Sequence, residues 1–108
     1  MYNNKYYLEM RISSRIKSPF NATELQRMEF ARLDHNRYFN NASSRQTKNR
    51  KYISKISTRN DIIGFYLETE YPVANQDRIG NALHMFSVFA ANNGLELYVS
   101  NHRFMRAA

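Results

Sequence analysis

The sequence predicts an α+β domain in which a four-stranded antiparallel sheet is covered on one face by two helices. Segments in which apolar and polar residues alternate, as in half-buried strands, stand near both ends and in the middle of the chain. Segments with apolar residues three and four positions apart, as in helices, separate them. The chain has 108 residues, the usual length of one domain. We therefore expect a single basic domain over residues 1–108.

The first half predicts a strand followed by a helix. Residues 6–17 alternate, and Ser18-Pro19 ends the pattern. Asn21 and Glu24 then have the spacing of a capping box, which predicts a helix from about Ala22 to Asp34. The side chains of this helix expected to face the core are Leu25, Met28 and Leu33. The polar segment 36–49 lacks periodicity and is predicted as a loop.

The second half predicts a hairpin, a helix and a last strand. Residues 51–58 and 62–71 are rich in β-branched and aromatic residues, and the turn residues 59–61 separate them. A helix follows, with Asn93-Gly94 as its C-terminal stop. Residues 95–101 alternate again, and the strand they predict extends at most to Met105. The apolar stripe of the helix consists of Ile79, Ala82, Leu83, Phe86, Phe89 and Ala90.

The predicted order of elements is β-α-β-β-α-β. One antiparallel sheet with both helices on the same face buries every apolar side, and this is the ferredoxin-like arrangement. The layout resembles that of RNA-recognition domains and other ferredoxin-like proteins in the order and length of its elements. This fold hosts unrelated functions, so function has to be argued from individual residues.

Positive charge is concentrated in one segment of the chain. The sequence has sixteen Lys and Arg against nine Asp and Glu. No acidic residue occurs from His35 to Asn60, whereas seven basic residues do, and the rest of the chain has equal numbers of each sign. The seven are Arg37, Arg45, Lys48, Arg50, Lys51, Lys55 and Arg59. Such a segment is typical of proteins that bind a polyanion.

The predicted site is a nucleic-acid-binding loop and strand. Its cations suit phosphates, neighbouring Ser, Thr, Asn and Gln residues add neutral donors, and an aromatic ring in it could stack on a base. We expect contacts to the backbone of RNA or single-stranded DNA, with little base readout. An alternative is that the lysines only protect an edge strand from pairing with another chain. The predicted site residues are Arg45, Lys48, Arg50, Lys51, Tyr52, Lys55 and Arg59.

A second surface is predicted on the face of the sheet that the helices leave open. Aromatic residues at this position would stack bases or form a homodimer interface, and Glu68 and Glu70 on the same face would repel phosphate. The residues expected to be exposed there are Tyr7, Arg11, Tyr66, Tyr98, His102 and Phe104.

The sequence gives little support for catalysis. His35, His84 and His102 are not at metal-ligand spacing, the carboxylates form no close pair, and no glycine-rich phosphate loop is present. We therefore expect no enzyme activity, no metal and no cofactor. A metal-independent ribonuclease that uses His35 or His102 is left as an alternative.

The absence of cysteine and of a long apolar segment predicts a cytoplasmic protein without a membrane span.

A rival to nucleic-acid binding is a small protein-binding inhibitor or adaptor of the phage or plasmid type. Its basic patch would cover an acidic or nucleic-acid-binding surface of a host protein.

Overall fold

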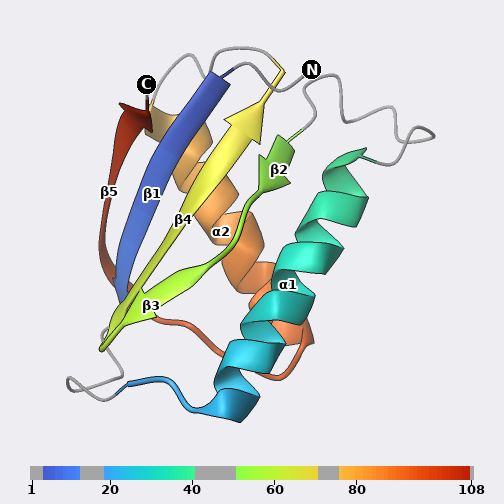
Figure 1. Cartoon of the computed structure of the whole chain (residues 1–108), viewed down its shortest axis with the longest axis vertical. Coiled ribbons are helices and arrows are strands. Elements are labelled where there is room, and N and C mark those ends of the chain that lie inside the picture. The colour runs from blue at the N-terminus through green and yellow to red at the C-terminus, as the bar shows by residue number, and fades with distance from the viewer. Residues whose placement is uncertain (1–3, 13–18, 41–50, 71–75, 108) are drawn as a thin grey trace.

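The computed structural model describes residues 4–12, 19–40, 51–70 and 76–107. Its elements are β1 (Asn4–Ile12), α1 (Ala22–Asn40), β2 (Lys51–Ile53), β3 (Ser57–Arg59), β4 (Ile62–Thr69), α2 (Gln76–Asn92) and β5 (Val99–Ala107). The strands run in the order β2-β4-β1-β5, and β3 also pairs with β4 (Figure 1). Every neighbouring pair is antiparallel. The predicted class, an α+β fold with an antiparallel sheet and two helices, is confirmed.

Alternation along the central strands separates the two faces of the sheet. In β1 the residues Tyr6, Leu8, Met10 and Ile12 are buried, and the residues between them are exposed or half-buried. In β4 the buried face continues with Ile63, Phe65 and Leu67. Side chains of a strand point alternately to opposite faces, so period-two patterning was enough to predict which face is the core.

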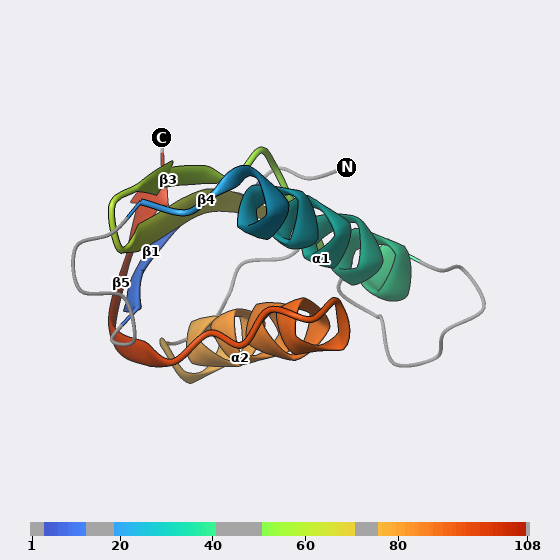
Figure 2. The ribbon, with the colours of Figure 1, turned by 90° about the horizontal axis from the view of Figure 1, so that it is seen from below.

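Both helices lie on the same side of the sheet, with α2 beneath its concave face (Figure 2) and α1 beside β2 at the sheet edge (Figure 1). Their buried residues join one cluster with the sheet, and Phe86 of α2 contacts Phe65 of β4 with ring centroids 5.4 Å apart. Neither helix in the described part of the chain is long and apolar enough to cross a lipid bilayer.

The strand predicted over residues 51–58 is divided into β2 and β3. Ile53 pairs with Leu67, and Ser57 pairs with Gly64. Three residues of the edge, 54–56, therefore stand opposite two residues of β4, which defines a β-bulge. A one-residue insertion reverses the face to which later side chains point. The bulge accordingly turns Ile56 toward the core and places Arg59 opposite Ile62, on the open face.

The hairpin between β3 and β4 turns at Asn60 and Asp61, as predicted. Asn60 has φ 55°, the left-handed region that Asn tolerates better than most residues. Asp61 is buried, and its carbonyl oxygen accepts the backbone N–H of Ile12 at 2.9 Å. The turn is thereby tied to the end of β1.

Helix α1 begins with the predicted capping box. The backbone N–H of Glu24 donates to Asn21 Oδ1 at 2.8 Å, and the backbone N–H of Asn21 donates to Glu24 Oε1 at 3.0 Å. The helix continues to Asn40, six residues beyond the predicted end at Asp34, so residues 36–40 of the predicted loop are helical. Residues 41–49 of that loop lie outside the described residues.

The predicted core side of α1 is right only for Met28. Leu25 and Leu33 are both 41% exposed, whereas Ala31, His35 and Asn36 are buried with Met28. The apolar residues of α1 are distributed around the helix, so their spacing does not identify the face that the sheet covers.

Helix α2 ends as the sequence predicts. Gly94 has φ 82°, its N–H donates to the carbonyl of Ala91 at 3.0 Å, and the N–H of Leu95 donates to that of Ala90 at 2.9 Å. These bonds form a Schellman motif. The last strand starts four residues later than predicted, at Val99, because residues 95–98 connect α2 to the sheet without joining it.

Candidate nucleic-acid interface

The predicted site divides between described and undescribed residues. Lys51 and Tyr52 belong to β2, Lys55 lies in the bulge between β2 and β3, and Arg59 ends β3. The remaining predicted members, Arg45, Lys48 and Arg50, lie outside the described residues. Within the described part, the site is therefore the edge of the sheet.

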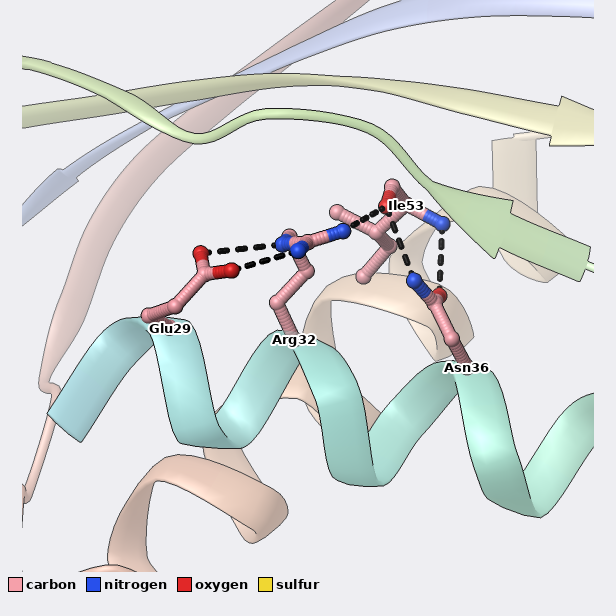
Figure 3. Close-up of polar contacts among 4 residues, drawn as sticks. All are labelled: Glu29, Arg32, Asn36 and Ile53. Atoms are coloured by element: carbon pink, nitrogen blue, oxygen red, sulfur yellow. Dashed lines mark hydrogen bonds and ion pairs between the residues drawn. The ribbon is translucent and has the colours of Figure 1, made fainter. Parts of the chain in front are cut away.

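Side chains of α1 bind the outer backbone groups of this edge (Figure 3). The Ile53 N–H donates to Asn36 Oδ1 at 2.7 Å, and Asn36 Nδ2 donates back to the Ile53 carbonyl at 2.9 Å. Asn36 thus satisfies both backbone groups of one residue, as a neighbouring strand would. We call the contacts of Arg32, Asn36 and Asn40 with β2 the edge clamp.

Arg32 and Asn40 complete the edge clamp on either side of Asn36. Arg32 Nη1 donates to the Ile53 carbonyl at 3.2 Å, and its Nε donates to Glu29 Oε2 at 3.0 Å. Hydrogen bonding to Arg32 lowers the pKa of Glu29, and the same contact raises the pKa of Arg32. Asn40 Nδ2 donates to the Lys51 carbonyl at 2.8 Å. The last residue of α1 is therefore bonded to the first residue of β2.

His35 lies behind the edge clamp, in the core. It is 0% exposed, and its ring contacts Phe39 and Phe89 at centroid distances of 4.7 and 6.2 Å. Asn36 Oδ1 accepts from the Ile53 N–H, so the 3.1 Å contact with His35 Nδ1 requires the proton on Nδ1. Nε2 is buried and has no hydrogen-bond partner among the described residues.

The surroundings of His35 disfavour its charged form. Burial, opposed by the hydrogen bond to Asn36 and assisted by the charge of Lys51, lowers the pKa of His35 to about 4. A buried neutral imidazole cannot reach a bound substrate. The burial of His35 therefore gives no support to the alternative in which it serves as the acid or base of a ribonuclease.

The described site residues do not share one face. Lys51 has the same strand parity as the buried Ile53, and its Nζ lies 5.0 Å from the Phe39 ring centroid, toward α1. Arg59 stands opposite Ile62, on the open face, whereas Tyr52, which pairs with Glu68, makes a side-chain hydrogen bond with Arg32 of α1. Strand alternation separates Lys51 from Tyr52, and the bulge turns Arg59 away from the side of Lys51, which the sequence pattern did not predict.

Tyr7 and Tyr66 lie on the open face, as predicted, and form an aromatic pair there. They are paired across β1 and β4, with ring centroids 5.2 Å apart. The Tyr7 ring covers Gly64, where a Cβ would overlap the phenol hydroxyl. Burial, and then the charge of nearby Glu9, raises the pKa of Tyr7.

Cations surround this aromatic pair. Lys5 Nζ lies 4.6 Å from the Tyr66 ring centroid, Arg11 Nη1 lies 2.9 Å from Asp61 Oδ2, and Arg103 Nη2 lies 3.4 Å from Glu9 Oε2. Two hollows open on the same face. One, of about 300 Å³, is lined by Glu9, Arg11, Ile62, Asn101 and Arg103, and the other, of about 240 Å³, by Tyr7, Glu9, Ser57, Thr58, Arg59, Ile62 and Gly64.

The remaining predictions for the open face are partly wrong. The backbones of His102 and Phe104 pair with those of Met10 and Leu8, and the predicted exposure of their side chains lies outside what the structure describes. Tyr98 is exposed but precedes β5, and its hydroxyl donates to Glu96 Oε2 at 2.6 Å. The predicted strand started too early, so its register could not be assigned. Arg103 was missed for the same reason.

Within the described residues, no three His, Asp or Glu side chains are grouped closely enough to hold a metal ion.

Comparison of the sequence with protein-family models and with curated proteins finds no match.

Proposed function

We propose that this protein is a non-catalytic module that binds the backbone of RNA or single-stranded DNA through its basic segment and the adjoining edge strand. The observation that carries the proposal is the charge pattern. Seven basic residues and no acidic residue occur between His35 and Asn60, and the rest of the chain is balanced. The proposed contacts are those of Arg45, Lys48, Arg50, Lys51, Tyr52, Lys55 and Arg59.

The edge clamp supports this proposal over the edge-protection alternative. The outward backbone groups of Ile53 and the carbonyl of Lys51 already bond to α1. Where the outward N–H and C=O groups of an edge strand are already hydrogen-bonded, another strand cannot pair with them. Lysines are therefore not needed there to prevent pairing. The positive charge of the segment therefore needs another explanation, and binding to a polyanion provides one.

The fold assignment that goes with this function is ferredoxin-like. We count β2 and β3 as one edge strand interrupted by a bulge, since both pair with β4. The module is placed in the cytoplasm, and its binding requires neither metal nor cofactor.

The proposal is tested by titrating the purified protein against unstructured RNA, single-stranded DNA and a DNA duplex at several salt concentrations. We expect both single strands to bind at physiological salt, with log affinity falling against log salt by about 0.7 per phosphate contact. EDTA should leave binding unchanged. A protein that binds none of these ligands, but captures one defined protein partner, would contradict the proposal and favour the inhibitor or adaptor.

A further inference from the structure

We propose that the open face of β1 and β4 is a stacking surface on which bases of a single-stranded nucleic acid lie against Tyr66 and Tyr7. This inference rests on the proposed function, and it adds a contact to bases beyond the basic segment. Aromatic rings beside a cationic surface are the usual means of holding single strands, because every base has a face that can stack.

The two tyrosines are placed to serve as such a surface. Tyr66 is 39% exposed at the centre of a sheet face that neither helix covers. Tyr7 lies next to it on the neighbouring strand. Its ring lies against Gly64, in the space that a side chain at this position would fill. A ring fixed by its neighbours loses little freedom when a base stacks on it.

Charge on this face is complementary to phosphate. The described cations around the tyrosines are Lys5, Arg11, Arg59 and Arg103. The carboxylates there are Glu9, which is paired with Arg103, Asp61, which is paired with Arg11, and Glu68, which stands opposite Lys5. The hollows beside the tyrosines are lined by the three arginines, by hydroxyl or amide side chains and by Glu9. Phosphates flanking a stacked base would lie next to these donors.

The same charge disfavours a second copy of the chain as the occupant. Face-to-face association would bring together two chains that each carry a formal charge of +7, and this net charge opposes it. A polyanion relieves this repulsion. Single-stranded nucleic acid is therefore the better fit, and a homodimer is an outcome to be tested.

The test compares a short oligothymidylate with an abasic oligonucleotide that has the same number of phosphates. Stacking predicts that the wild-type protein binds oligothymidylate about tenfold more tightly, the equivalent of about 1.4 kcal/mol. Tyr66→Ala should remove most of this difference and leave the affinity for the abasic strand and the salt slope unchanged. Tyr66→Phe should retain it.

Tyr38→Ala is the matched control, because Tyr38 is a similarly exposed tyrosine on α1. It should bind both ligands as the wild type does. Gly64→Ala gives a second variant: the added methyl group displaces Tyr7 and should also reduce the preference for oligothymidylate.

Equal affinity of the wild-type protein for both ligands, unchanged in Tyr66→Ala, would overturn the stacking surface and leave the proposed function standing. No binding to either ligand would overturn both. Sedimentation velocity provides the remaining outcome: a wild-type dimer that Tyr66→Ala converts to a monomer would assign this face to self-association instead.

Discussion

The two faces of the sheet differ in what their residues contribute. The face toward the helices is apolar, and its fully buried residues include Leu8, Phe65 and Leu67. The open face is a mixture of tyrosines, cations and carboxylates, most of which are exposed or half-buried. Stability and binding are thus assigned to opposite sides of the same strands. Substitutions on one face should change the free energy of unfolding, and substitutions on the other should change ligand affinity.

The largest loss of stability is expected from Phe86→Ala. Phe86 is 0% exposed and packs on Phe65, so truncation should reduce the free energy of unfolding by about 3–5 kcal/mol. Phe89→Ala should cost less, because Phe89 is only partly buried. Chemical denaturation of both variants measures the difference. Equal and small losses would show that α2 packs through another face.

His35 should make stability depend on pH. In the unfolded chain it binds a proton near pH 6.5, but in the folded protein its pKa is about 4. The unfolded state therefore binds more protons between these values, so stability is complete above about pH 7 and falls as the pH drops from 6.5 to 4. The expected loss is about 3 kcal/mol.

Denaturation of His35→Gln across this pH range isolates that contribution from the titration of carboxylates. The variant should lose less stability on acidification than the wild type. His84→Gln, at an exposed histidine of α2, is the control and should follow the wild type. A His35→Gln variant with the wild-type pH dependence would contradict the account of the buried imidazole.

The edge clamp should contribute less than the core. Asn36→Ala leaves the buried N–H of Ile53 without its acceptor, which should cost about 1–3 kcal/mol. Gln26→Ala, at an exposed position of the same helix, should stay within about 0.5 kcal/mol of the wild type. Unfolding free energies compare the two. An Asn36→Ala variant as stable as Gln26→Ala would mean that the β2 edge does not depend on α1.

The smallest effect on stability is expected on the open face. Tyr66→Ala removes the ring contact with Tyr7 and the cation–π contact with Lys5, and should cost less than about 1.5 kcal/mol. A thermal melt close to that of the wild type would confirm that this face can be altered without disturbing the core. A cooperative loss of structure would show instead that the two faces are not independent.

Local signals predicted the fold well, and contacts between distant segments explain what was missed. The capping box of Asn21 and Glu24 and the stop at Gly94 depend on residues a few positions apart, so the sequence was sufficient to place them. Asn36 was assigned to a polar loop, although it is buried. The acceptor and donor that make its burial favourable belong to Ile53, seventeen positions away.

In the candidate site too, the features that depend on contacts between distant segments could not be predicted from the sequence. The excess of basic residues could be counted, but the direction of Arg59 depends on an extra residue in the edge strand, and a bulge has no distinct signature here. Alternation continued from Ile53 would have turned Arg59 toward the helices. The pairing of Tyr7 with Tyr66 likewise required the register between β1 and β4.

The most direct test of the central claim is the salt dependence of single-strand binding by Lys48→Ala/Arg50→Ala/Lys51→Ala. If these cations contact phosphates, the triple variant should bind more weakly to all sequences, and the slope of log affinity against log salt should fall by about 2. Its melting temperature should change little, and light scattering should detect no aggregation. An unchanged slope in a folded, soluble triple variant would contradict the assignment of the basic segment as the nucleic-acid interface.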